Sequence, residues 1–254
     1  VCITDYNNLM GSFHFLKSLE NINKKNKSEN KKKLKPIIGI TLNVCEDHLD
    51  RSRRDDGYQI VFLAKNKKGY KNLSKLSSLA YTKGFYYVPR VDKDLVLNFK
   101  DDLIVLTGNT YGEVSSKLLN IGEKQAEESL LWWNKHFKDD LYIEIMRHNL
   151  EDEKRINPVL IKFSVKHKIK LVATNSVFYL TKEQANSHDI LLCVKDGEKQ
   201  STPIGRGRGF RYGLPNHEYY FKTKEQMIEL FSDIPDAIAN TSEVIAKVES
   251  FDLK

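Results

Sequence analysis

The side chains of this sequence that could bind a metal ion or move a proton stand at the ends of apolar runs that predict strands. Asp5 and Tyr6 close the run that opens the chain, and His148 follows the run at 141–146. In α/β enzymes the carboxyl ends of the strands hold most of the reactive side chains. The other positions at or near the strand ends carry mostly neutral groups: Thr41, Asn43, Gln59, Thr107, Asn109, Asn175, Ser176 and Phe178.

This set of side chains is poor in metal ligands. A hydrolytic metal cluster needs several His, Asp, Glu or Cys side chains that converge, and only Asp5 and His148 qualify at these positions. Glu144 alternates with apolar residues inside its run, and its side chain faces either a barrel interior or solvent. No order of Ser, His and Asp, or of Cys and His, favours nucleophilic catalysis. The pattern predicts no catalytic residue and at most a residual polar site at Asp5 and His148.

Composition narrows the class of protein. The 254 residues are 40% hydrophobic and include 12 Phe and 12 Tyr, which is enough for a globular core. No run approaches the roughly 18 apolar residues of a membrane span, and the N-terminus lacks the order of a secretory signal. Cys2, Cys45 and Cys193 are too few and too scattered for a disulfide framework or a zinc pair. We expect a soluble, cytoplasmic protein without a membrane contact or a cofactor.

Much of the net charge of +7 lies in one segment. Residues 21–35 hold seven lysines, Lys31, Lys32 and Lys33 among them, with almost no apolar residue. This composition predicts a solvated, mobile loop. The alternative is transient contact with nucleic-acid phosphates, which would be salt-sensitive and independent of base sequence because the segment has no aromatic stacking surface.

A second basic stretch lies in a segment rich in Gly and Pro that begins near residue 200. It carries Arg206, Arg208 and Arg211, interleaved with Phe210 and Tyr212. Two interpretations stay open for these arginines. They contact phosphates or an acidic partner surface, or they hold the loop against its own domain through local acids.

The order of elements predicts an α/β fold. Strands are expected at 1–4, 37–44, 58–64, 103–108, 141–146 and 171–175, and helices around Lys17 and at 69–84, 112–137 and 158–168. This alternation favours a parallel sheet covered by helices. A barrel is favoured over an open nucleotide-binding sheet because no glycine-rich phosphate loop follows a strand. Val1 begins inside an apolar strand, from which we infer a missing N-terminal portion.

Several motifs together are similar to one known family. The stretches "ITDYNNLMGSFHF", "KPIIGITLNV", "FLAKNKKGYKNLSKLSSLAY", "LVATNSVFYL" and "FSDIPDAIANTSEVIAKV" resemble, in the right order along the whole chain, the N-terminal PHP (polymerase and histidinol phosphatase) domain of bacterial DNA polymerase III alpha subunits. The insertion "IGRGRGFRYGLPN" looks like the Bacteroidetes versions. The resemblance implies a distorted seven-stranded (β/α) barrel over 1–200, whose first strand lies upstream of Val1. A Gly/Arg-rich loop and C-terminal helices over 201–254 would lead towards the polymerase domains.

The resemblance also implies what has happened to the family's metal site. Matched motif by motif, the six positions that carry metal ligands in metal-binding members and fall within this chain are Tyr6, Thr41, Gln59, Asn109, Ser176 and Phe178. All six ligands are replaced by neutral side chains. A degenerate site of this kind should hold no divalent cluster, because the ligand bonds and the charge neutralisation are both lost.

The resemblance thereby implies a DNA replication function without local catalysis. The parent protein would be a DNA-directed DNA polymerase whose catalytic carboxylates lie downstream of Lys254. This chain would be an inactive scaffold for those downstream domains and for a separate proofreading exonuclease subunit, with DNA bound by the holoenzyme. Two rival hypotheses are a metal-dependent phosphoesterase or 3'-5' exonuclease with a relocated site around Asp5, His148 and Glu144, and a nucleic-acid-binding module built on the two basic segments.

Overall fold

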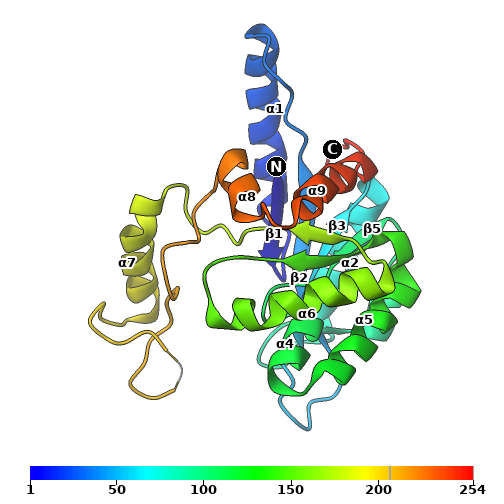
Figure 1. Ribbon diagram of the computed structural model, residues 1–254, viewed down its shortest axis with the longest axis vertical. Coiled ribbons are helices and arrows are strands. Elements are labelled where there is room, and N and C mark those ends of the chain that lie inside the picture. Colours follow the sequence, from blue (N-terminus) through cyan, green and yellow to red (C-terminus); the bar gives the residue numbers. More distant parts are fainter. Residues whose placement is uncertain (206, 254) are drawn as a thin grey trace.

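A single curled sheet forms the centre of the molecule in the computed structural model, which describes residues 1–205 and 207–253 (Figure 1). The strands pair in the order β1-β2-β3-β5-β6-β7, and β4 pairs with β2. Their bounds are β1 Cys2–Tyr6, β2 Ile37–Cys45, β3 Tyr58–Ala64, β4 Val91–Asp92, β5 Leu103–Leu106, β6 Leu141–Ile145 and β7 Leu171–Ala173. No pairing joins β7 to β1 within the described residues, so the sheet is a partial barrel. The predicted barrel-type α/β fold is confirmed.

The sheet is mixed, and the prediction of a parallel sheet was wrong. β1 is parallel to β2, β5 to β6, and β6 to β7. β3 runs antiparallel to both of its neighbours, β2 and β5. Segment 46–57 joins β2 to β3 without a crossover helix, so the chain turns back on itself there. The two-residue β4, too short for periodicity to detect, brings the strands within the described residues to seven.

Helices surround the sheet, and four of them, α2, α4, α5 and α6, cover its outer face. Their bounds are α1 Ser12–Ser28, α2 Lys67–Thr82, α3 Lys93–Asn98, α4 Glu113–Asn120, α5 Glu123–Phe137, α6 Glu151–His167, α7 Ala185–Asp196, α8 Lys224–Leu230 and α9 Pro235–Lys247. The main core lies between the outer face and α2, α4, α5 and α6, and includes Ile40, Phe62 and Trp133, all at most 1% exposed. α6 begins seven residues before Pro158, where the sequence predicted its start, so the proline lies inside the helix.

The sequence of α2 explains why this helix forms and where it docks. The Asn66 side chain accepts hydrogen bonds from the N–H groups of Lys68 and Gly69, which caps the first turn. Leu73, Leu76 and Ala80 recur at helical spacing and are completely buried against β2 and β3. The cap fixes the start of the helix, and the apolar stripe fixes the face that meets the sheet.

The inner face of the sheet is closed at one end by α9. Val61, Leu63 and Tyr142 on the strands form a second apolar cluster with Val244 and Val248. The Tyr142 hydroxyl also donates a 2.6 Å hydrogen bond to the Glu243 carboxylate. α9 therefore packs into the partial barrel itself. The domain division at residue 200 stays a prediction.

The lysine-rich segment is ordered, and its prediction as a mobile loop was wrong. α1 continues through Ser28, and residues 29–36 return along it (Figure 1). The Asn23 amide donates to the Leu34 carbonyl at 2.8 Å, and its oxygen accepts from the Leu34 N–H at 2.7 Å. Leu19 is buried and anchors the helix, and lysine is a good helix former. The composition of the segment correctly indicated that its lysine side chains are solvated. It did not reveal the hydrogen bonds of Asn23 or the burial of Leu19, which hold the segment in place.

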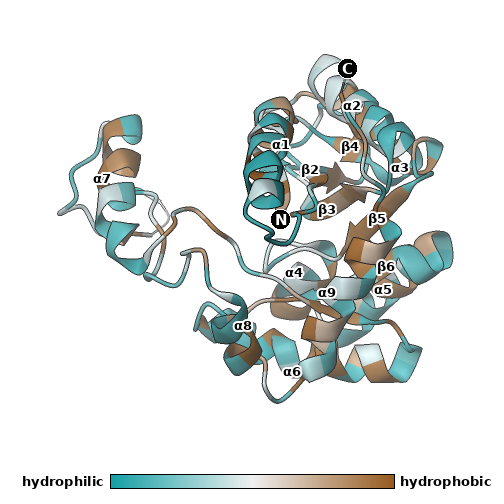
Figure 2. Cartoon of the chain, turned by 90° about the horizontal axis from the view of Figure 1, so that it is seen from above, coloured by the Kyte–Doolittle hydropathy of each residue, from teal (hydrophilic) through white to brown (hydrophobic). Residues whose placement is uncertain are grey.

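α7 stands apart from the barrel as part of an arm (Figures 1 and 2). The return limb of the arm meets the barrel again, where Asn216 donates to the His148 carbonyl and Tyr219 stacks on the His148 ring. We call residues 180–222 the α7 arm. Within it Arg211 is buried, and its guanidinium donates to both carboxylate oxygens of Asp189 at 2.7 and 2.9 Å. Of the two interpretations for this arginine, the local acid is correct, and Arg211 as a phosphate contact is wrong. Arg208 is exposed, and Arg206 lies outside the described residues.

The packing of α9 yields a stability prediction. Val244 is 5% exposed and Ile245, one position along, is 40% exposed. Val244→Asp should lower the free energy of unfolding by about 3 kcal/mol or more, because it buries an unpaired carboxylate. Ile245→Asp is the matched control and should change it by less than about 1 kcal/mol. Urea unfolding measures both, and equal effects would show that α9 is not part of the core.

Candidate functional site

The strand register brings three of the six positions that the resemblance matches to metal ligands to one face of the sheet. Tyr6 is paired with Thr41, and Asn43 is paired with Gln59. Paired residues point to the same side, and side chains alternate along a strand. Gln59 therefore shares its face with Val61, which lies in the inner apolar cluster. The side chains of Tyr6, Thr41 and Gln59 all belong to the inner face, at the end that α9 leaves open.

A fourth position joins them from the loop after β5. The Asn109 amide donates to the Gln59 oxygen at 3.5 Å, and Asn109 also lies beside Tyr6. Burial, with Tyr212 and Glu144 nearby, raises the pKa of Tyr6. Thr41 donates its hydroxyl hydrogen to the Thr4 carbonyl at 3.2 Å. We call these contacts the neutral network of the inner face, because they join neighbouring segments and none of the four positions carries a charged side chain.

A glycine makes the loop after β5 possible. Gly108 has φ +86°, a left-handed conformation that side chains other than glycine rarely adopt. A Cβ at this position would lie 2.1 Å from the Gln59 carbonyl oxygen. The Gly108 N–H also hydrogen bonds to the Glu144 carboxylate. Glycine therefore lets the loop approach β3 closely and places Asn109 beside Gln59.

The last two ligand positions lie after β7, beside His148. The Ser176 N–H donates to His148 Nε2 at 3.2 Å, and the Ser176 hydroxyl contacts the Met146 sulfur at 3.5 Å. Phe178 packs edge-on against Tyr219, with the ring centroids 5.9 Å apart. Neither side chain contributes a charged ligand.

His148 itself is held by structural contacts on all sides. It is 2% exposed, its Nδ1 lies 2.7 Å from the Glu153 carboxylate, and its ring stacks on Tyr219 at 4.5 Å. Nδ1–H donates to Glu153, which leaves the Nε2 lone pair to accept from the Ser176 N–H. Because both ring nitrogens are engaged, His148 offers no free lone pair to a metal ion.

The structure does not bring Asp5 and Glu144 together. Asp5 is paired with Ile40, whose side chain belongs to the core on the outer face. Glu144 is paired with Val172, which belongs to the inner cluster. The two carboxylates therefore lie on opposite faces of the sheet. The sequence left open whether the Glu144 side chain faces a barrel interior or solvent, and the structure shows that it faces the interior.

Glu144 is the buried charge of the inner face. It is 4% exposed, and one oxygen accepts a 2.6 Å hydrogen bond from the Thr174 hydroxyl. The other oxygen, Oε2, has no partner within the described residues. Burial raises the pKa of Glu144 to about 7, against the opposing effect of the hydrogen bonds from Thr174 and Gly108. The inner face therefore contributes less than one full negative charge from this residue at neutral pH.

The side chains at these six positions do not fit a cluster of divalent metal ions. The six positions offer a phenol, two hydroxyls, two carboxamides and a phenyl ring, without an imidazole or a carboxylate. Two or three divalent ions in one cavity need anionic and imidazole ligands to neutralise their charge. Glu144 alone cannot supply that charge, so no catalytic step is derived through a metal here.

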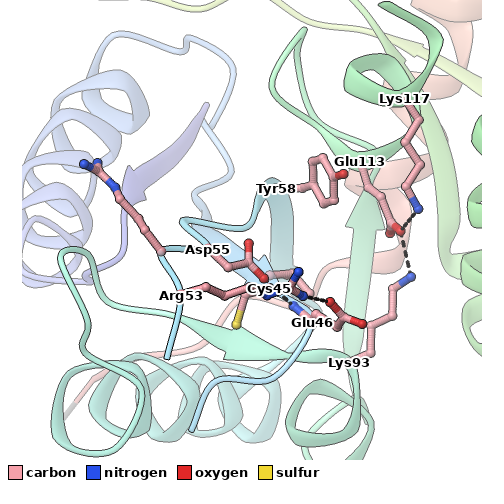
Figure 3. A pocket seen from close by; sticks show the side chains of 10 residues that line it. Cys45, Glu46, Arg53, Asp55, Tyr58, Lys93, Glu113 and Lys117 are labelled. Atoms are coloured by element: carbon pink, nitrogen blue, oxygen red, sulfur yellow. Dashed lines mark hydrogen bonds and ion pairs between the residues drawn. The ribbon is translucent and has the colours of Figure 1, made fainter. Parts of the chain in front are cut away.

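Sequence reasoning missed a charged cluster on the outer side of the sheet. A pocket of about 580 Å³ is lined partly by Lys93, Glu113 and Lys117 (Figure 3). Both ammonium groups lie 2.8 Å from the same Glu113 oxygen, and the Trp133 N–H donates to the other. Burial opposes the ionisation of Glu113, but the two lysines outweigh it and lower its pKa. Only the Glu113 and Lys117 pair, at i and i+4, was visible in the sequence.

A second missed group consists of Asp47, His48 and Asp92, whose ligand-type atoms lie within 4.8 Å of one another. It is the one such group among residues 1–205 and 207–253. Asp92 caps α3 by accepting from the Leu95 N–H, and it also contacts the His48 ring. Burial opposes ionisation of Asp92, but the hydrogen bonds from His48 and Leu95 prevail and lower its pKa. These contacts account for the cluster as a structural support of the loop after β2.

Comparison with known proteins identifies the class to which this fold and site belong. The family model of the PHP domain matches residues 1–148, and the chain belongs to that family. No helix of the described residues is long and apolar enough to cross a membrane.

Among curated proteins the chain is similar to DNA polymerase III subunit alpha from several bacteria. It is 37% identical to that of Campylobacter jejuni over 97% of this chain, and 34% identical to that of Borreliella burgdorferi over 99%. The protein from Treponema pallidum is 36% identical over 95% of this chain. The chain spans about a fifth of the length of these relatives.

The burial of Glu144 predicts a pH dependence of stability. Its pKa of about 7 lies above the ordinary value of 4.5, so the folded protein keeps a proton that the unfolded chain has lost. Stability from this group is complete below pH 4.5 and falls as the pH rises to about 7, by roughly 3 kcal/mol in all. Glu144→Gln should remove that loss.

Urea unfolding at pH 5 and pH 8 measures the effect as a difference between the native protein and the variant. Glu151→Gln is the control, because the Glu151 side chain is 82% exposed. It should leave the pH dependence unchanged. An identical pH dependence for the native protein and Glu144→Gln would contradict the burial of a titrating carboxylate.

Proposed function

We propose that this chain is the PHP domain of a bacterial replicative DNA polymerase, a DNA polymerase III alpha subunit, and that it is a catalytically silent scaffold. The observation that carries the proposal is the replacement of all six ligand positions by neutral side chains in a chain that matches such polymerases at 31–37% identity over at least 95% of its length. The polymerase activity itself belongs, in this proposal, to domains outside this chain.

The neutral network supports a structural role for the inner face. Asn109, in the loop after β5, donates a hydrogen bond to Gln59 on β3, and Thr41 on β2 donates one to the Thr4 carbonyl on β1. Satisfied polar networks of this kind rigidify a fold, whereas an empty ligand cage would leave mutually repelling carboxylates. In this proposal, the space that a metal cluster would occupy is lined by neutral side chains that help to hold the strands of the sheet together.

The rival enzymatic hypothesis has no support from the geometry. It needs Asp5, His148 and Glu144 in one site, but Asp5 and Glu144 lie on opposite faces, and both His148 ring nitrogens are engaged. A relocated phosphoesterase or exonuclease site is therefore not proposed.

The scaffold role requires contact surfaces for partners, and the α7 arm supports one. Leu180, Leu191 and Val194 are 69%, 63% and 73% exposed on it. The salt bridge between Arg211 and Asp189 braces the return segment against α7. Exposed aliphatic side chains on a braced element are typical of docking surfaces. We assign this surface to the polymerase's own downstream domains, which make up most of the length of the relatives.

The proposal includes two further partners, a proofreading exonuclease subunit and DNA. A separate proofreading exonuclease subunit docks on the PHP domain, and DNA is held by the assembled polymerase in the bacterial cytoplasm. The support for this is the likeness to the alpha subunit along the whole chain.

The silent site predicts the outcome of a metal analysis. Protein purified without chelator should contain well under one equivalent of zinc, manganese or iron per chain. It should not hydrolyse a nucleotide phosphodiester such as thymidine 5'-(p-nitrophenyl phosphate). Elemental analysis and a release assay measure both, and His148→Ala should give the same background. Two or three equivalents of metal, with turnover abolished in His148→Ala, would overturn the proposal.

The scaffold proposal also predicts two separable interactions. The protein should co-purify with the cognate proofreading exonuclease and, separately, with the downstream polymerase domains supplied in trans. Leu191→Asp with Val194→Asp should lose the downstream domains and keep the exonuclease.

Lys195→Asp with Lys199→Asp on the same arm is the matched charge control. It should retain both partners. A failure of the unaltered protein to capture either partner would contradict the scaffold role, and retention of the downstream domains by the apolar variant would contradict the assignment of the α7 arm.

A further inference from the structure

The net charge of the chain is concentrated on one projecting hairpin. We call residues 12–35, which comprise α1 and its return segment, the lysine hairpin. It contains eight lysines and two glutamates, so it carries six of the seven formal positive charges, and the rest of the chain is almost neutral. Figure 1 shows α1 projecting from the sheet, and in Figure 2 most of its residues have the colour of hydrophilic residues.

Side-chain clamps hold the two limbs of the hairpin together. Asn23 makes its two hydrogen bonds to the backbone of Leu34. One turn further along, the Asn26 amide donates to the Lys32 carbonyl at 3.0 Å, and the Lys31 N–H donates to the Asn26 carbonyl at 2.8 Å. These bonds set the positions of the backbone that bears the lysines. Binding a polyanion through them therefore costs less ordering entropy than binding through a mobile loop.

Four ammonium groups near the tip have no partner among the residues that the structure describes. Glu29 engages Lys25 and Lys31, at 3.8 and 2.6 Å. No ion pair or hydrogen bond within the described residues involves the ammonium groups of the other tip lysines, all of them exposed: Lys24, Lys27, Lys32 and Lys33. A cluster of uncompensated charges on a small domain repels itself, and an external anion relieves that repulsion.

The chemistry of the tip distinguishes between polyanions. From Asn23 to Lys33 there is no apolar and no aromatic residue. A membrane-binding helix inserts an apolar face beside its lysines, and a single-strand binder stacks bases on aromatic rings. Neither feature is present at this tip. Lysines without stacking groups fit the regular phosphate backbone of a duplex, contacted without base readout.

We propose that the lysine hairpin is a phosphate-binding arm that holds duplex DNA, independently of base sequence, through Lys24, Lys27, Lys32 and Lys33. The choice of DNA among duplex polyanions rests on the proposed function. The arm acts at a distance from the inner face and needs no metal.

The test is the affinity of the protein for a fluorescein-labelled 30-base-pair duplex, measured by anisotropy between 50 and 200 mM NaCl. The variant replaces the four lysines together, as Lys24→Gln, Lys27→Gln, Lys32→Gln and Lys33→Gln. At 50 mM NaCl its affinity should be at least about tenfold weaker. The slope of log K against log salt concentration should shrink by about 3 to 4, since each phosphate contact contributes about 0.9.

A control variant carries the same loss of charge elsewhere on the surface, as Lys71→Gln, Lys124→Gln, Lys135→Gln and Lys224→Gln, all at exposed positions. It should bind within about twofold of the unaltered protein. Circular dichroism checks that α1 persists in the hairpin variant.

Three results would overturn the proposal: no duplex binding by the unaltered protein at 50 mM NaCl, equal losses in the two variants, or hairpin-dependent binding to phosphatidylglycerol vesicles without binding to the duplex. Capture of the exonuclease and of the downstream domains is measured independently. If the protein captures its partners but does not bind the duplex, only the proposal for the lysine hairpin is rejected. If it fails to capture its partners, the proposed function as a polymerase domain is rejected.

Discussion

Charge neutralisation around divalent ions is the constraint on which the interpretation of this PHP domain depends. A cluster of two or three cations is stable only among carboxylates and imidazoles. The inner face instead presents Tyr6, Thr41, Gln59 and Asn109, joined in part by their own hydrogen bonds. Glu144 is buried on the same face, and one of its carboxylate oxygens has no partner among the described residues. A single carboxylate cannot neutralise two or three divalent cations.

Three other groups of charged side chains lie outside that interior and have other roles. Glu113 is neutralised by Lys93 and Lys117 on the outer side of the sheet. Asp189 and Arg211 brace the α7 arm. The net positive charge of the chain is concentrated on α1 and its return segment. In the proposed scaffold, the interior supports the fold while the two projecting elements, the α7 arm and the lysine hairpin, make the contacts with other molecules.

The sequence predicted the class of fold, because strands and helices can be recognised from local motifs. The six ligand positions implied by the PHP resemblance stay a prediction. The sequence did not predict the reversal of β3, since periodicity gives the existence of a strand and not its direction. The order of the lysine hairpin also escaped prediction, because it depends on Asn23 meeting Leu34 eleven residues away.

The orientation of individual polar residues was equally hidden. Arg211 is paired with Asp189, and Glu113 with Lys93 and Trp133, across long sequence separations. Only the register of paired strands shows that Glu144 faces inward and Asp5 outward. That register also explains why two carboxylates that seem available in the sequence do not form one site.

The most direct measurement is anomalous X-ray scattering from crystals of the protein soaked in manganese or zinc salts, with data collected on both sides of the metal absorption edge. The account predicts no anomalous peak in the space bounded by Tyr6, Gln59, Asn109 and Glu144. Two or three peaks there, bridged by protein side chains, would contradict it.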